Sequence, residues 1–358
     1  MPLKTLLPFD MICMGLSVFG LSIFLTRWMM RMGIHDHPVK RSSHTTPTPR
    51  SGGVAIALSF AGGILFLLAR QYLSYISLTR LITLGGAIGV TCFFSLKDDI
   101  KGLSFLQKFI VQALTGCAIV MVGLSISEIP LPYFGVVPLK ALGGVLSVFW
   151  IIFFMNVFNF MDGLNGLASG VSIIASLFCT IISFLFMEQS MFYLSLTLFF
   201  ATLGFFIFNF PRGKIFMGDV GSQFLGLIWS IMLFIPTQEL SPISIYTIPL
   251  LFFSFIYDVS ITVGRRIWNK ESFWLAHRTH LFQLLNRLGY SHKQVTCLHL
   301  CMAMLQGMGA IWMQYLEPTH QIFMFIPYFV LMVGYHAWIF RALKKRILPY
   351  RKKRKKKK

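Results

Sequence analysis

Long apolar runs recur along this chain and limit what it can fold into. About eleven of them lie between residues 10 and 340, and a run of about 20 apolar residues is long enough to cross a membrane as a helix. Only 12% of the 358 residues are charged, roughly half the share of a soluble domain. The short alternating segments of a transmembrane barrel do not occur. The sequence therefore predicts an all-α polytopic integral membrane protein.

Hydrophobic periodicity and run length give the approximate bounds of the spans. The predicted spans are residues 10–30, 52–69, 81–96, 105–124, 143–161, 167–187, 191–210, 222–236, 243–263, 295–315 and 321–340. No internal repeat or long linker divides them. We therefore expect one integral membrane domain, residues 1–341, followed by a basic tail, residues 342–358.

The basic residues predict how these spans are oriented. If the N-terminus lies outside, the Lys and Arg residues of the connections fall on the cytoplasmic side, apart from Lys4, Arg70, Arg80 and Lys140. Connections rich in Lys and Arg stay in the cytoplasm, so we expect a periplasmic N-terminus and a cytoplasmic C-terminus. The formal charge of +20 then reflects topology and a tail that binds anionic lipid, and no nucleic-acid partner is expected.

Two of the expected cytoplasmic connections contain candidate phosphate or metal ligands. In RSSHTTPTPRSGG (41–53), His44 and Arg50 could bind phosphate, or the loop could simply lie on anionic lipid. In KDD (97–99), Asp98 and Asp99 end an apolar helix, where the helix dipole and their mutual repulsion disfavour both charges. A divalent cation or a shared proton would relieve this strain; a solvated turn is the alternative.

The stretch NVFNFMDGLNG (156–166) brings polar groups to the end of another apolar run. Asn156, Asn159 and Asp162 recur every three residues, so they share one face if the helix persists. Glycine lets a backbone approach a ligand closely, while Asn and Asp supply donors and acceptors. The stretch is interpreted as one wall of a nucleotide-sugar site; a capped helix break is the alternative.

Two further cytoplasmic stretches carry groups suited to phosphate. In FMGDVGS (216–222), Asp219 between glycines suits a metal–phosphate site, Phe216 could stack on a base, and Ser222 is suited to cap the next helix. In HRTH (277–280), both histidines could bind phosphate together with Arg278, because the third ligand of a zinc site is missing. Capping alone, or structural histidines, would also explain these patterns.

One acid lies inside a predicted span. Asp258 falls in the ninth run, before two arginines, and we expect it to pair with Arg265 or Arg266. An acid within a membrane could also mark the path of a transporter. The polar motifs gather at one face, however, whereas transporter sites lie near the bilayer midplane between repeats, so a lipid or ion transporter is the weaker hypothesis.

In sequence order, KDD, NFMDG, FMGDVGS and HRTH resemble the motifs of the polyprenyl-phosphate N-acetylhexosamine-1-phosphate transferases. The resemblance extends from His35 to about Leu288. The loop at 41–53 and the HRTH motif are closer to the O-antigen-initiating branch than to the phospho-MurNAc-pentapeptide transferases of peptidoglycan synthesis, where a run of histidines replaces the interruption at Thr279. The peptidoglycan enzyme remains the alternative.

The resemblance implies an enzyme of a bacterial inner membrane that transfers a sugar-1-phosphate from a UDP-N-acetylhexosamine to undecaprenyl phosphate and releases UMP. It implies Mg²⁺, for which Mn²⁺ could substitute, and an active site that faces the cytoplasm. Asp219 would bind the metal, with Asp98 and Asp99 at the metal and the lipid phosphate, one of them a candidate base. Asp162 and Phe216 would hold the uridine, and His277, Arg278 and His280 would contact phosphates.

The resemblance leaves some properties open. Family members often have a second acid three residues after the Asp162 position, and here that residue is Asn165, which argues against a catalytic acid there. The choice among UDP-linked N-acetylglucosamine, N-acetylgalactosamine and their 6-deoxy relatives is not determined by the sequence. A homodimer is equally compatible with it, because dimerising membrane helices need no distinctive signal.

Overall fold

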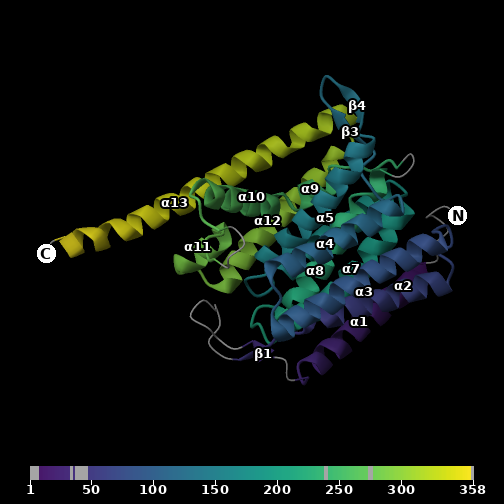
Figure 1. Ribbon diagram of the computed structural model, residues 1–358, viewed down its shortest axis with the longest axis horizontal. Helices are drawn as coiled ribbons and strands as arrows, with labels where there is room; N and C mark the ends of the chain where they lie inside the picture. Colours follow the sequence, from purple (N-terminus) through teal and green to yellow (C-terminus); the bar gives the residue numbers. More distant parts are fainter. Residues whose placement is uncertain (1–7, 33–34, 37–46, 238–240, 273–276, 356–358) are drawn as a thin grey trace.

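The computed structural model describes residues 8–32, 35–36, 47–237, 241–272 and 277–355, most of which are helical (Figure 1). Strands in the described residues form two short antiparallel pairs. β1 (His35–Asp36) pairs with β2 (Thr48–Pro49), and β3 (Glu128–Leu131) pairs with β4 (Gly135–Pro138). The prediction of an all-α protein is confirmed.

The helices follow the predicted apolar runs closely. They are α1 (Pro8–Met29), α2 (Gly52–Ala69), α3 (Leu78–Lys101), α4 (Phe105–Met121), α5 (Ala141–Met161), α6 (Leu167–Leu185), α7 (Gln189–Asn209), α8 (Gly218–Met232), α9 (Thr247–Leu251), α10 (Phe253–Trp268), α11 (Leu281–Arg287), α12 (His292–Met313) and α13 (Phe325–Lys355). The described residues also form two 3₁₀ turns, η2 (Ile235–Thr237) and η3 (Pro318–Met324).

Eight helices of the described chain are long and apolar enough to cross a membrane, which confirms a polytopic membrane protein. They are α1, α2, α3, α5, α6, α7, α12 and the segment from η3 into α13. The other three predicted spans correspond to α4, α8 and the pair α9 and α10, which are shorter. In Figure 1, α13 extends away from the bundle toward the C-terminus.

The short helix α8 lies at the centre of the bundle. It packs against α2, α3 and α5, and every residue from Val220 to Met232 is buried. A helix enclosed on all sides needs to be apolar all round rather than amphipathic. Because α8 packs against several helices, its first turn brings the polar residues near Asp219 into contact with the ends of those neighbours.

The predicted ninth span, 243–263, is wrong as a single helix. The chain breaks at Phe252 into α9 and α10, and the ring of Phe252 is fully buried near Trp229 and Phe154. Gln306 of α12 lies at the break, with its amide group 3.0 Å from the carbonyl oxygen of Leu251 and 2.9 Å from the backbone nitrogen of Ser254. Side chains of neighbouring helices make such breaks tolerable by satisfying the freed backbone groups.

The glycine pair at the start of α2 allows a close helix contact near the polar end of α8. A Cβ on Gly53 would lie 2.0 Å from the backbone nitrogen of Gly221. No side chain fits at that separation, so this contact needs glycine at position 53.

We expect Gly53→Ala to destabilise the protein by about 1–3 kcal/mol, the usual cost of overpacking a core, because backbone atoms must move apart. Gly20→Ala is the matched control, since a Cβ there has no atom within 4 Å. Thermal unfolding of the purified protein in detergent would measure both. Equal melting temperatures for the two variants would contradict this account of the α2–α8 contact.

Candidate active site

Backbone hydrogen bonds join the segment before α2 to the segment before α8. The N–H of Phe216 donates to the carbonyl of Pro49 (2.7 Å), the N–H of Gly52 donates to that of Phe216 (3.0 Å), and the N–H of Gly53 donates to that of Met217 (2.8 Å). These bonds hold Arg50 beside the first turn of α8.

A tight connection between α3 and α4 sets the positions of Asp98 and Lys108. Gly102 takes a positive φ of 72°, which glycine adopts without steric cost, and its N–H donates to the carbonyl of Asp98 (2.9 Å). The carboxylate of Asp98 accepts from the N–H of Leu103 (2.6 Å). Ser104 then begins α4 with a capping box, and the ammonium of Lys108 contacts Asp98.

Asp99 caps the N-terminus of α8. Its carboxylate accepts from the backbone N–H groups of Asp219 (2.9 Å) and Val220 (3.3 Å) and pairs with the Nε of Arg50 (3.0 Å). Carboxylates stabilise helix N-termini because the first N–H groups have no partner within the helix. Ser222 was expected to cap this helix, and that prediction is wrong, because α8 begins at Gly218 and Ser222 lies inside it.

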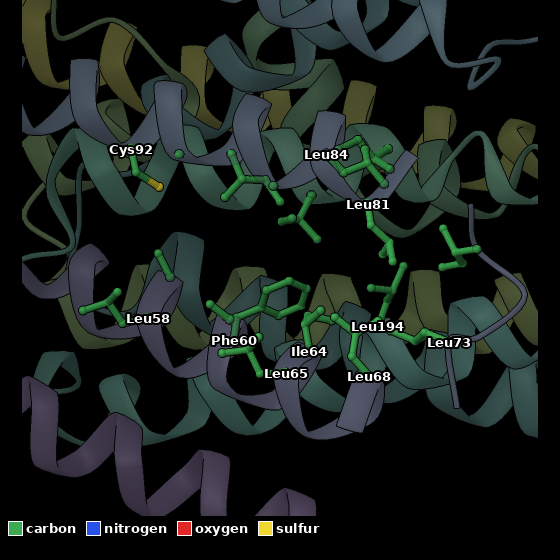
Figure 2. Close-up of a pocket in the computed structure, with 18 of the residues that line it drawn as sticks. Leu58, Phe60, Ile64, Leu65, Leu68, Leu73, Leu81, Leu84, Cys92 and Leu194 are labelled. Atoms are coloured by element: carbon green, nitrogen blue, oxygen red, sulfur yellow. The ribbon is translucent and has the colours of Figure 1, made fainter. Parts of the chain in front are cut away.

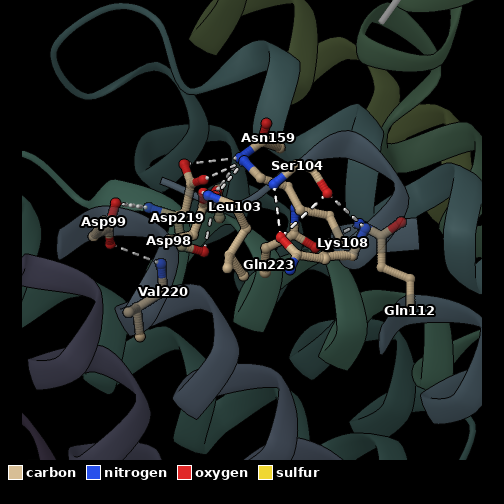
Figure 3. Close-up of polar contacts among 12 residues, drawn as sticks. Asp98, Asp99, Leu103, Ser104, Lys108, Gln112, Asn159, Asp219, Val220 and Gln223 are labelled. Carbon is tan, nitrogen blue, oxygen red and sulfur yellow. Dashed lines mark hydrogen bonds and ion pairs between the residues drawn. The ribbon is translucent and has the colours of Figure 1, made fainter. Parts of the chain in front are cut away.

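The carboxylate of Asp219 is the centre of the cluster in Figure 3. It contacts Arg50 (3.1 Å), Lys108 (3.1 Å) and the amide of Asn159 (3.1 Å). Burial acts to raise the pKa of Asp219, but the hydrogen bond with Asp98 and the charges of Lys108 and Arg50 outweigh it and hold that pKa below its usual range. The group is therefore an anion at neutral pH.

The end of α5 supplies the polar wall expected from the sequence. α5 stays helical to Met161, and Asn159 also donates to Ser222 (3.1 Å). One turn earlier, Asn156 donates to Gln112 (2.8 Å), which donates to Gln223 (2.9 Å).

Asp162 follows directly as the residue that ends α5, and its N–H donates to the carbonyl of Phe158 (3.0 Å). Burial, and then the charge of Asp219, raise the pKa of Asp162 to about 7. A carboxyl with this pKa exists in both protonation states near neutral pH, so Asp162 can donate a hydrogen bond as well as accept one.

Asp258 pairs with His280, so its expected pairing with Arg265 or Arg266 is wrong. Its carboxylate accepts from the Nδ1 of His280 (3.1 Å) and from the backbone N–H of Leu281 (3.0 Å) at the start of α11. Both side chains are buried. A buried carboxylate needs several donors, and the first turn of α11 provides them, whereas Arg265 donates to the carbonyl of Thr279 (2.8 Å).

The HRTH motif lies against the end of α5. The ring of His280 is 5.7 Å from that of Phe160 and 4.9 Å from that of His277. Burial, and then the electrostatic interactions with His280 and Arg266, lower the pKa of His277 to about 4. His277 is thus a neutral imidazole at neutral pH, and Arg278, half-buried beside it, carries the permanent charge of the motif.

The structure brings five of the twelve predicted site residues into one directly connected cluster. Arg50, Asp98, Asp99, Asn159 and Asp219 are linked directly or through Lys108. Phe216 takes part through its backbone bonds to the Arg50 segment. His44 lies outside the described residues. Asn165 lies apart, donating to the carbonyl of Pro211 (3.3 Å).

Three polar residues of the region were missed in the sequence. Lys108, Gln112 and Gln223 lie within apolar helices, and each bonds to another polar side chain. Their signal was present, because a polar or charged residue within a membrane helix is itself a reason to expect a site. Which partners they find depends on how α4, α5 and α8 pack.

The donor set is compatible with a magnesium ion. Among the described residues no three or more His, Cys, Asp and Glu side chains form a ready-made metal cage. Mg²⁺ usually needs only one or two carboxylates and takes its other ligands from water and substrate phosphates. Asp98 and Asp219 both contact the ammonium of Lys108, so their carboxylates already converge on a cation, whereas both oxygens of Asp99 accept backbone N–H groups. The roles of Asp219 and Asp99 as metal ligands stay predictions.

Known protein sequences match this chain over the segment that contains the cluster. A profile described as glycosyl transferase family 4 matches residues 81–236, which contain the three acids of the cluster. A probable undecaprenyl-phosphate N-acetylglucosaminyl 1-phosphate transferase of Bacillus subtilis is 31% identical over 78% of this chain and 76% of its own length. The chain belongs to glycosyl transferase family 4.

Two other relatives carry the names of different enzyme activities. A decaprenyl-phosphate N-acetylglucosaminephosphotransferase of Mycolicibacterium smegmatis is 28% identical over 86% of this chain and 83% of its own length. A phospho-N-acetylmuramoyl-pentapeptide-transferase of Staphylococcus aureus is 30% identical over 80% of this chain and 92% of its own length. The resemblance read from the motifs is therefore confirmed at the level of the family.

We expect Asp258→Asn to destabilise the family 4 protein by about 1–3 kcal/mol, the usual cost of leaving a buried donor unsatisfied, because the amide keeps one acceptor oxygen where the donors of His280, Leu281 and Phe282 use two. Glu271→Gln is the control, since its pair with Arg266 (2.9 Å) is half exposed and such pairs contribute about 0–1 kcal/mol. Thermal unfolding in detergent would compare them. Similar melting temperatures would contradict the structural role of Asp258.

Proposed function

We propose that this protein transfers an N-acetylhexosamine-1-phosphate from a UDP-sugar to undecaprenyl phosphate, giving undecaprenyl-diphosphate-sugar and UMP. The observation that supports this most strongly is the convergence of Asp98 and Asp219 on one cation beside Arg50, at the ends of membrane helices. Such a site can bring a charged, water-soluble diphosphate against a lipid phosphate. A transporter would instead hold its charged groups near the bilayer midplane.

The reaction forms a bond between an oxygen of the acceptor phosphate and the sugar-bearing phosphorus of the UDP-sugar. It breaks the anhydride bond to the uridylyl phosphate, which leaves as UMP. The acceptor phosphate is already ionised near neutral pH, so a strong general base is not required. The main difficulty is the repulsion between two anions, which preorganised positive charge reduces.

The residues of the cluster fit these needs. Arg50 and Lys108 are each about one-third exposed, so their charged ends can reach phosphate oxygens while they remain paired with acids. Asp219 and Asp98 would hold a Mg²⁺ ion, which would neutralise charge on the diphosphate as the anhydride bond breaks. Asp99 would keep the first turn of α8 in place, and Asp162, Asn159 and Phe216 would form the nucleotide side of the pocket.

The same proposal implies where the protein is located, which lipids it contacts and what its product is used for. The basic connections support an active site on the cytoplasmic side of a bacterial inner membrane, and the basic tail would bind anionic lipids there. The product would initiate O-antigen or a related cell-envelope glycan. A phospho-N-acetylmuramoyl-pentapeptide transferase remains the second candidate, because a relative with that name covers most of this chain.

The test is UMP release by the purified protein with undecaprenyl phosphate, Mg²⁺ and a panel of UDP-sugars that includes UDP-MurNAc-pentapeptide. We expect release with one of the UDP-N-acetylhexosamines and none when the acceptor is left out. Turnover of UDP-MurNAc-pentapeptide instead would favour the second candidate. No release with any donor would reject the proposed transfer.

Asp219→Asn should lower the rate of transfer by at least about 100-fold, the usual effect of removing an electrostatic stabiliser of the transition state. Asp99→Asn should keep measurable activity, because its side-chain oxygen can still accept from the N–H of Asp219. The exposed Glu128→Gln, in β3, is the control and should match the wild type. Turnover of Asp219→Asn at the wild-type rate would remove it from the metal site.

A further inference from the structure

The hairpin formed by β3 and β4 carries exposed aromatic residues on its turn. It joins α4 to α5 and projects from the bundle beside the start of α13 (Figure 1). Tyr133 and Phe134 at the turn are 99% and 79% exposed. The sequence of residues 129–139, IPLPYFGVVPL, contains no charged side chain. Exposed apolar patches mark places where a protein contacts a membrane or another protein, so the turn requires a partner.

Contacts with the bundle hold the hairpin in place. β3 packs against η3, and the hydroxyl of Tyr246 donates to the carbonyl of Pro130. At the base of the hairpin, the N–H of Ile126 donates to the hydroxyl of Ser147 in α5 (2.8 Å). The turn therefore presents its aromatic side chains at a fixed position relative to the helices.

The backbone at Tyr133 also indicates that its ring makes a contact outside the chain. Its φ is 66°, in a region that bulky residues rarely adopt. Hairpin turns that need this conformation mostly use Gly, Asn or Asp. An aromatic residue is therefore kept at a position whose backbone disfavours it, although its ring is almost fully exposed.

The length of α5 indicates the level of the hairpin in the membrane. α5 is a candidate membrane span that begins just after β4 and ends beside the polar cluster. A helix of 21 residues extends roughly 30 Å at 1.5 Å per residue, about the thickness of the hydrocarbon core. With the charged cluster at one surface of the bilayer, the hairpin lies at the level of the lipid head groups on the other.

Other exposed aromatic residues lie at the same end of the bundle. Trp312 and Tyr315, at the end of α12 just before η3, are 67% and 70% exposed. Since η3 packs against β3, these residues and the hairpin lie at similar depth. Trp and Tyr are enriched where membrane helices meet the head groups, so this end of the bundle has the composition of a membrane interface.

Apolar surface on the membrane helices themselves has a simpler explanation. A groove of about 590 Å³ between α2 and α3 is lined by apolar side chains, among them Phe60, Ile64 and Leu84 (Figure 2). Both helices are candidate spans, and lipid chains are as apolar as such a lining. The β3–β4 hairpin lies outside the candidate spans, so its apolar turn needs a separate explanation.

We propose that the β3–β4 turn is a membrane anchor, in which Tyr133 and Phe134 insert into the lipid head-group region at the end of α5 remote from the polar cluster. The paired strands satisfy each other's backbone groups, so only side chains need to enter the lipid. Interfacial anchors set the tilt and rotation of membrane helices. The anchored helix is α5, whose other end holds Asn159 against Asp219 (3.1 Å).

A protein partner, either a second copy or another chain, is the competing occupant of the turn. A stable protein interface takes about 800 Å² from each partner, whereas two aromatic side chains supply roughly 300–500 Å². Protein interfaces also have a polar rim, and residues 129–139 contain no charged side chain. Both observations favour the lipid.

Phe134→Trp tests the anchor in nanodiscs that hold one copy of the full chain. The measurement is the emission of the variant minus that of the wild type, which has seven Trp residues. One quencher is phosphatidylcholine brominated on its acyl chains near the head group, and the other is acrylamide in the water. We expect the brominated lipid to remove most of the added emission and acrylamide to remove little. Tyr133→Trp has the same expected result and guards against a local disturbance by either substitution.

Glu128→Trp is the matched control, because Glu128 is an exposed residue at the base of the same hairpin and a charged residue there belongs in water. We expect acrylamide, and not the brominated lipid, to quench its added emission. Quenching of both turn variants by acrylamide alone would overturn the anchor, as would equal lipid quenching of all three variants. Protection from both quenchers in single-copy nanodiscs would bury the turn in the chain itself and also overturn it. Lipid quenching that disappears in densely loaded vesicles would assign the turn to a second copy.

Discussion

The buried carboxylate of Asp99 determines how three parts of this membrane protein meet. It accepts the first N–H groups of α8 and pairs with Arg50 ahead of α2, while its own backbone lies in the last turn of α3. A buried charge is costly unless several donors surround it, and a buried helix N-terminus is equally costly without acceptors. The carboxylate of Asp99 supplies the acceptors that the N-terminus of α8 needs, and that N-terminus supplies donors for the buried charge. The polar end of the bundle therefore has one favourable arrangement.

The rest of the polar region follows from that contact. With α8 fixed, Asp219 lies between Arg50 and Lys108, and Asn159 on α5 can reach it. Behind it, Gln112, Gln223 and Asn156 satisfy one another within apolar helices. Acidic, basic and amide groups of separate helices therefore meet at the first turn of α8.

Several features of the fold and of the site could be predicted from the sequence alone. Apolar run length predicted the membrane helices, because the bilayer sets how long an apolar helix must be. Acids at helix ends, such as Asp99 and Asp219, identified the candidate site, because such groups need partners. The break at Phe252 was not predicted, since the groups packed around it, such as Gln306, lie far along the chain. The partner of Asp258 was missed for the same reason.

The sequence by itself determined that this is a membrane protein of many helices with acidic, basic and amide groups near helix ends, and the motif order indicated its family. These properties are local, because each depends on the composition of one run or one short stretch. Only the tertiary structure decided that Asp99 caps α8, that Lys108 joins Asp98 to Asp219, and that the β3–β4 hairpin packs against η3. Those outcomes depend on contacts between segments far apart in the chain, which packing selects and local sequence does not.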